Sequence, residues 1–315
     1  MGKVHARAYS KMPDVQLVGG FDSHSERLAA FSQEFGAEAS PSMDSLLASV
    51  DVVDVCVPTH RHAEYALRAI EAGKAVVCEK PMARTVAECE TICEAAARKG
   101  TTFMPAQVLR FFPEFKKAQE MVASGSVGNV ATVRTRRGGD FPRAAADWYA
   151  DFDKSGGAML DLIIHDFDWI RWTFGPIQRV FARAITFDGY DHLDYALVMM
   201  KTKSGAIVHT EGIWCEPTGF RVAFEICGDR GMLEYDSGKS APLITAVREE
   251  AGSIAGVSIP ESPSNTDPYF DELRHFIDCV QSGASPDVSA QDGLEAVRIS
   301  LAAIESVKTG RAVYL

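Results

Sequence analysis

The chain has 315 residues, of which 46% are hydrophobic and 24% charged, and its formal net charge is −11. An acidic chain without a basic block argues against nucleic acid or an anionic membrane as the main partner. No apolar stretch approaches the roughly 20 residues of a spanning helix, so we expect no membrane partner. The N-terminus lacks a secretory signal, and the seven cysteines form no CxxC pair. We therefore expect a cytoplasmic location.

The first third of the chain alternates apolar runs with helical patterns. Helices are predicted at 3–12, 25–36, 62–73 and 85–100, and strands at 15–22, 52–58, 75–79 and 101–107. Near-continuous apolar strands separated by helices indicate a parallel sheet covered on both faces. Such sheets bind ligands at the carboxyl ends of their strands, where Asp22, Pro58–Thr59 and Glu79–Lys80 lie.

A dinucleotide site needs a glycine turn before a helix and an acid about 20 residues later. Asp22 fits the acid, although a strand-end Asp is often only a turn or cap residue. Gly2 fits the last glycine of the turn. The first strand and the first two glycines are missing before it, so we expect a start assigned too far downstream or a clipped chain.

The pattern changes after a helix predicted at 111–128. Strands are predicted at 130–138, 179–187, 194–203, 206–215, 220–228 and 231–236, with hairpin turns at 203–205 and 229–231. Their alternation fits one sheet with one face on helices and one face free. Residues 237–266 are predicted to be a loop with one short strand, and helices are expected at 268–283 and 292–310.

One predicted helix, residues 156–172, carries titratable groups at helical spacing. Asp161 and His165 are four residues apart and share a face, and Asp168 lies seven beyond Asp161. Histidine is the usual general acid or base near neutral pH. A core histidine beside a local carboxylate and a weak metal set, Asp161–His165–Asp168, stay open as alternatives.

Three segments, MGKVHARAYSKMPDVQLVGGFD, CVPTHRHAEYALRAIEAGKAVVCEKPMARTVAEC and SGGAMLDLIIHDFDWIRWTFG, resemble the Gfo/Idh/MocA family of oxidoreductases. The family includes glucose–fructose oxidoreductase and inositol 2-dehydrogenase. The resemblance implies a Rossmann domain at 1–108 and an α+β domain at 109–315 with a mostly antiparallel open sheet. It also implies NAD, with NADP left open, and a sugar or cyclic polyol substrate.

The resemblance also implies roles for individual residues. Lys80, His165 and Asp161 are expected to be catalytic, with His165 as proton acceptor; a strand-end ion pair of Glu79 and Lys80 is the plain alternative. The expected cofactor residues are Gly2, Asp22, Arg27, Pro58, Thr59, His62, Glu79, Lys80 and Gln107. The expected substrate residues are Lys80, Arg110, Trp148, Asp161 and His165. No metal is expected.

Several of these residues have structural alternatives. Thr59 stands where family members often have Asn, a mild change. His62 could instead be a solvated helix-end residue, Arg110 could brace the interdomain helix, and Trp148 could be a buried structural residue. Arg136, Arg137 and Arg143 could favour an acidic substrate, or mark a solvated strand end.

The sequence thus predicts an NAD(P)-dependent dehydrogenase that acts on CH–OH groups of a sugar or polyol. An NAD-dependent glycosidase of the same fold and a non-catalytic sensor remain alternatives. Because the free sheet face often forms the subunit interface in this family, a homodimer or homotetramer is expected.

Overall fold

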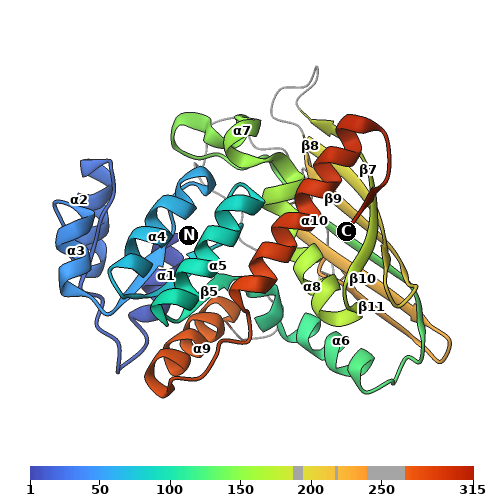
Figure 1. Ribbon diagram of the computed structural model, residues 1–315, viewed down its shortest axis with the longest axis horizontal. Helices are drawn as coiled ribbons and strands as arrows, with labels where there is room; N and C mark the ends of the chain where they lie inside the picture. Colours follow the sequence, from blue (N-terminus) through green and yellow to red (C-terminus); the bar gives the residue numbers. More distant parts are fainter. Residues whose placement is uncertain (187–193, 217–218, 240–266) are drawn as a thin grey trace. The chain divides into compact units, whose positions relative to one another are not determined.

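The computed structural model describes residues 1–186, 194–216, 219–239 and 267–315 (Figure 1). The chain divides into two compact units, Met1–Phe111 with Asp267–Leu294, and Phe112–Thr266 with Glu295–Leu315. Most of the loop predicted at 237–266 lies outside the described residues. The domain division at residue 108 stays a prediction.

The first unit consists of parallel strands and the helices between them. In chain order its main elements are α1 (Gly2–Tyr9), β1 (Gly19–Gly20), α2 (Ser25–Phe35), β2 (Glu38–Ala39), α3 (Met43–Ser49), β3 (Val52–Val55), α4 (His62–Glu71), β4 (Ala75–Glu79), α5 (Val86–Lys99), β5 (Phe103–Ala106) and α9 (Pro268–Ser282). The predicted helices of this region are present, and α3 was not predicted. The strand expected at 15–22 is reduced to Gly19–Gly20.

The strands of this unit form two parallel ladders instead of the single sheet that we expected. β1 pairs with β2, and β3, β4 and β5 form a separate three-stranded sheet in that order. Among the described residues, no strand pairs with the second edge of β3. The apolar pattern predicts where strands form, but a ladder also requires a neighbour at hydrogen-bonding distance.

The helix ends in this unit follow from local side chains. The hydroxyl of Thr85 accepts a hydrogen bond from the backbone N–H of Glu88, whose carboxylate accepts one from the backbone N–H of Thr85. This reciprocal capping box fixes the start of α5. Gly36 ends α2 in the left-handed conformation, which costs glycine little.

Residues far apart in the sequence share the core of the first unit. Apolar side chains of α1, β4 and β5 pack against α9 and the segment after it. The buried members are Ala8, Tyr9, Met12, Val77, Met104, Ala106, Leu273, Phe276, Ile277 and Val288. The hydrophobic effect therefore holds α9 in the N-terminal unit.

The second unit is built on a seven-stranded sheet of order β11-β10-β6-β9-β8-β7-β12. Its main elements are α6 (Pro113–Ala123), β6 (Val130–Gly139), α7 (Phe152–Ser155), a π-helix (Ala158–Leu162), α8 (Ile164–Phe174), β7 (Ile177–Thr186), β8 (Asp194–Thr202), β9 (Ile207–Trp214), β10 (Arg221–Gly228), β11 (Met232–Asp236), α10 (Ala290–Thr309), which spans the unit boundary, and β12 (Val313–Tyr314). Among the described strands of this sheet, only β6 and β9 pair in parallel. The mostly antiparallel sheet is confirmed, and β12 was not predicted.

The two faces of this sheet differ as the alternation predicted. Val198 and Met200 of β8 are buried, whereas Leu197 and Met199 are 45% and 44% exposed. On the covered face, Trp169 of α8 packs against Phe115 of α6 and contacts the sheet. None of the described helices is long and apolar enough to cross a membrane.

Candidate active site

Glu79 and Lys80 stand at the carboxyl end of β4. The side chain of Glu79 is buried, and its Oε2 accepts a hydrogen bond of 3.0 Å from the backbone N–H of Lys80. The Lys80–Pro81 peptide bond is cis. The carboxylate therefore fixes the backbone at which Lys80 leaves the sheet.

Glu79 is ionised over the whole neutral range. Burial raises the pKa of its carboxyl, but the ion-pair contact with His5 more than offsets this, and the pKa falls to about 2. A buried carboxylate with a low pKa needs a cationic or donor partner, and here His5 supplies it.

His62 connects the loops after β3 and β4. It is buried, with Nε2 2.7 Å from the carbonyl oxygen of Val57 and Nδ1 2.6 Å from that of Pro81. Burial lowers its pKa, partly offset by these two carbonyls. Thr59, the first residue of the short helix Thr59–Arg61 that precedes it, is buried as well. The solvated alternative for His62 is therefore wrong.

Gly2 and Asp22 occupy two of the positions expected for a dinucleotide. Gly2 opens α1, and a Cβ at this residue would lie 3.7 Å from Cβ of Cys56, just beyond β3. The positive end of α1 thus stands at the carboxyl end of a parallel strand, as anion binding requires.

Asp22 follows β1 and makes only local contacts among those that the structure describes. Its Oδ1 accepts hydrogen bonds from the backbone N–H of His24, at 2.8 Å, and from Arg27, at 3.1 Å. The side chains of Asp22 and Arg27 are 36% and 48% exposed, so both are accessible to a ligand.

Gln107 and Arg110 follow β5. Gln107 is completely buried, and within the described part of the chain neither polar atom of its amide has a hydrogen-bond partner. An orphaned buried amide costs free energy unless a ligand satisfies it, so this residue fits a cofactor with polar groups. Arg110 instead donates to the carbonyl oxygen of Asp287, at 3.0 Å, and approaches Asp292, at 3.4 Å.

In the second unit, the segment that carries Asp161 differs from the single α-helix that we expected. Residues Ala158–Leu162 form a π-helix, and α8 begins at Ile164. π-Helical turns occur often at functional sites. Asp161, which is buried, and His165 therefore lie on two helical segments, and simple i, i+4 spacing does not describe them.

Glycines and a distant carboxylate cause this irregularity. Gly157 has a φ of 65°, and the buried Asp194 of β8 accepts a hydrogen bond of 2.7 Å from the backbone N–H of Ala158. A Cβ on Gly212 of β9 would lie 2.7 Å from Cγ2 of Ile163, where the π-helix ends. Glycine at 212 thus lets the strand approach this joint closely.

The arginines of β6 are engaged in ion pairs. Nε of Arg137 lies 2.6 Å from Oδ2 of Asp166, and both side chains are almost wholly buried. Arg136 pairs with Glu211 and Glu216, and Arg143 is exposed. A solvated strand end therefore does not describe Arg137, which anchors α8 to the sheet.

Trp148 lies in the short helix Ala145–Ala150 before α7. Its ring stacks on Tyr149 with a centroid distance of 3.9 Å, and Tyr149 in turn meets Trp214 edge-on. Trp148 itself is half-buried. It remains a predicted substrate residue.

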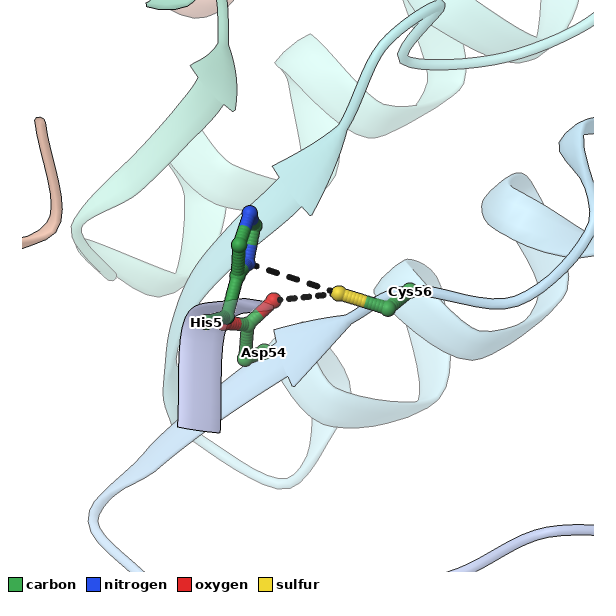
Figure 2. A group of neighbouring side chains, drawn as sticks. All are labelled: His5, Asp54 and Cys56. Carbon is green, nitrogen blue, oxygen red and sulfur yellow. Dashed lines mark hydrogen bonds and ion pairs between the residues drawn. The ribbon is translucent and has the colours of Figure 1, made fainter. Parts of the chain in front are cut away.

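A buried polar cluster behind Glu79 was not predicted. His5 lies between Asp54 and Glu79. Figure 2 shows Cys56 beside His5 and Asp54. Among the described residues, His5, Asp54 and Cys56 are the one group whose metal-ligating atoms lie within 4.8 Å of one another, so Asp161, His165 and Asp168 do not form such a group. The sequence contains one indication of this cluster, because Asp54 is a carboxylate inside the apolar run VVDVCV.

Comparison with known proteins covers almost the whole chain. Residues 1–107 match the oxidoreductase family with an NAD-binding Rossmann fold, and residues 115–234 match the GFO/IDH/MocA C-terminal domain. Myo-inositol 2-dehydrogenase of Thermotoga maritima is 29% identical over 100% of this chain and 96% of the relative. D-xylose 1-dehydrogenase (NADP(+)) 2 of Haloferax volcanii is 29% identical over 92% and 89%.

Solved structures agree with these sequence matches. The crystal structure of GenD2 from gentamicin A biosynthesis, in complex with NAD, superposes with a TM-score of 0.89 at 26% identity and covers 100% of this chain and 93% of that one. With both domain models matched in order, the chain belongs to the Gfo/Idh/MocA family of NAD-binding oxidoreductases.

Proposed function

We propose that the protein is an NAD-dependent dehydrogenase that oxidises a CH–OH group of a cyclic polyol, such as an inositol, or of a related sugar. The observation that carries this proposal is the Glu79–Lys80 pair at the carboxyl end of β4, in a unit that matches the NAD-binding Rossmann family. The names of the relatives support the substrate class. They do not favour the glycosidase and sensor alternatives.

Oxidation of an alcohol removes a hydride from carbon and a proton from oxygen. NAD supplies the hydride acceptor. The proposal gives Lys80 the task of hydrogen-bonding the reacting hydroxyl and stabilising its developing negative charge. His165 accepts the proton as general base, and Asp161 orients the substrate hydroxyl.

The residues of the first unit fit the cofactor. The N-terminus of α1 at Gly2 offers backbone N–H groups to a pyrophosphate, and Gln107 offers an unsatisfied amide. The carboxylate of Asp22 can accept hydrogen bonds from ribose hydroxyls and disfavours a 2′-phosphate. These features support NAD as the preferred cofactor.

The test is turnover of defined substrates. The purified protein is incubated with myo-inositol, scyllo-inositol or D-xylose and with NAD or NADP, and the absorbance of the reduced nicotinamide is followed. Lys80→Met and His165→Ala should each lower kcat by at least about 100-fold. Lys203→Met, in the exposed turn between β8 and β9, is the matched control and should retain activity. Unchanged turnover in Lys80→Met would reject the assignment.

We also propose that the free face of the seven-stranded sheet joins subunits in a homodimer or homotetramer. Ile185, Leu197 and Met199 expose apolar area there, on the face that also carries the ion pair of Arg134 and Glu225. A large exposed apolar patch commonly marks an interface. Light scattering should give a dimer or tetramer for the wild type and a smaller species for Leu197→Asp.

A cytoplasmic location is also part of the proposal, and it is supported by the seven free cysteines, which suit a reducing compartment.

A further inference from the structure

His5 of α1 is almost wholly buried, yet both of its ring nitrogens face carboxylates. Nδ1 lies 2.8 Å from Oδ2 of Asp54, and Nε2 lies 3.3 Å from Oε1 of Glu79. Figure 2 shows one nitrogen on the side of Asp54 and Cys56 and the other on the far side of the ring. The imidazole therefore connects Asp54 of β3 with Glu79, the last residue of β4.

Nδ1 of His5 is hydrogen-bonded to Asp54, whereas Nε2 meets Glu79 as an ion pair without hydrogen-bond geometry. An ion pair with both carboxylates requires the imidazolium form, which carries a proton on each nitrogen. Burial alone lowers the pKa of His5, but Asp54 and Cys56 raise it, and the result lies well above the ordinary value of 6.5. The geometry agrees with this direction, since a buried charge is tolerated where it is paired with an opposite charge.

The surrounding contacts leave His5 as the main anchor of Glu79. Asp54 also accepts hydrogen bonds from the hydroxyl of Tyr9, at 3.0 Å, and the thiol of Cys56, at 3.1 Å. Glu79 presents Oε1 to His5 and Oε2 to the backbone N–H of Lys80. Movement of the imidazole would therefore be passed through Glu79 to the backbone of Lys80.

We propose that His5 is a positioning residue for the dehydrogenase reaction: its imidazolium ties Glu79, and through it the backbone of Lys80, to Asp54. This inference rests on the proposed function, because it assigns His5 an effect on the reaction that acts through Lys80. His5 itself touches neither substrate nor cofactor in this scheme.

A metal site formed by His5, Asp54 and Cys56 is the competing interpretation. Their ligand atoms are close enough together, but each already has a hydrogen-bond partner in the cluster. The thiol of Cys56 is also poorly suited, because burial and then Asp54 raise its pKa to about 12. The contacts therefore favour a hydrogen-bonded clamp, and metal binding becomes an outcome of the test.

The pH behaviour of the clamp depends on the groups that face it. These are Tyr9 of α1 and the amino group of Met1, Asp54 and Cys56 at β3, Cys78 of β4, Lys80, His62 of α4 and Glu272 of α9. Loss of the proton of His5, or protonation of Glu79, would break the contact between these two residues.

The first variant is His5→Gln, which keeps a polar side chain but removes the cation. Without the imidazolium, burial should raise the pKa of Glu79, so that kcat acquires an acid limb at a pH where the wild type shows none. At the optimum pH we expect kcat to fall by roughly 10- to 100-fold with a smaller change in KM, because misplacement alone costs that much. In His5→Gln/Glu79→Gln the acid limb should disappear while kcat stays low.

A second variant, Asp54→Asn, keeps the shape of the cluster and guards against a variant that does not fold. Loss of the Asp54 charge should lower the pKa of His5, so that the imidazolium is lost as pH rises. In this variant, kcat should then decline on the alkaline side at a lower pH than in the wild type. Tyr9→Phe is the matched control on the same helix: it removes one donor to Asp54 and should lower stability without creating an acid limb.

The outcomes separate the two levels of the proposal. If Lys80→Met retains turnover, the proposed function fails. If Lys80→Met loses turnover while His5→Gln and Asp54→Asn keep the kcat and pH profile of the wild type, the clamp is overturned and the function stands. Stoichiometric binding of Zn²⁺ by the wild type, lost in His5→Gln, would also overturn the clamp.

Discussion

Arg137 and Asp166 form an almost wholly buried ion pair, with Nε of the arginine 2.6 Å from Oδ2 of the aspartate. The pair joins β6 to α8, one residue beyond His165. Removal of one partner from such a pair leaves an uncompensated charge in the interior. The position of α8 on the sheet therefore depends on both groups.

Arg137→Ala should lower the free energy of unfolding by about 3–5 kcal/mol. Lys117→Ala is the control in the same unit, because Lys117 pairs with Glu120 on the exposed side of α6 and should cost less than about 1 kcal/mol. Urea unfolding followed by far-UV circular dichroism measures both. Equal losses in the two variants would show that the buried pair is no stronger than the exposed one.

Glu79→Gln tests the pH dependence of stability. The folded pKa of Glu79 is about 2, below its ordinary value of 4.5, so its charge stabilises the fold above pH 4.5 and this stabilisation is lost as pH falls toward 2. The wild type should exceed Glu79→Gln by roughly 3 kcal/mol near neutral pH, with the difference shrinking in acid. A difference that is independent of pH over this range would show that the low pKa is wrong.

Gly157→Ala should disturb the entry to the π-helix. A Cβ at this residue would lie 2.5 Å from Oδ2 of Asp194, in addition to the backbone strain of φ 65°. Gly175→Ala carries similar backbone strain, about 1–3 kcal/mol, but its Cβ would meet nothing within 4 Å. We expect Gly157→Ala to melt at a lower temperature than Gly175→Ala and to lose more kcat. Identical melting temperatures of the two variants would show that the close contact with Asp194 does not add to the cost of the substitution.

Asp22→Ser should shift cofactor preference toward NADP. Loss of the carboxylate removes repulsion of a 2′-phosphate, and the ratio of kcat/KM for NADP to that for NAD should rise about tenfold or more. Glu26→Ser removes another exposed carboxylate, from the first turn of α2, and controls for net charge. An equal rise in the Glu26 variant would assign the effect to overall charge.

Elements determined by nearby residues could be predicted from the sequence. β4 has its predicted bounds, 75–79, and α5 begins after Thr85 because the capping box lies within four residues. The positions of Glu79 and Lys80 at a strand end followed from the same apolar pattern. The family resemblance supplied their expected chemistry.

Features that depend on distant partners could not be predicted. The first residue of the π-helix, Ala158, donates its backbone N–H to Asp194, which lies 36 residues further along the chain. The sequence around Arg137 is that of a strand-end arginine, and its partner Asp166 lies 29 residues further along the chain. The contacts of His5 with Asp54 and Glu79 join α1, β3 and β4, and no periodicity in the sequence predicts them.

The inclusion of α9 in the first unit affects how the protein can fold while it is being made. The core of the first unit includes residues up to Val288. The unit therefore cannot complete this core when residue 111 leaves the ribosome. The strands of the second unit emerge first, while apolar residues of α1 and β5 still lack their cover. Nascent chains are prone to aggregate while apolar surface is exposed. This protein therefore keeps an unfinished nucleotide-binding unit exposed during most of its translation.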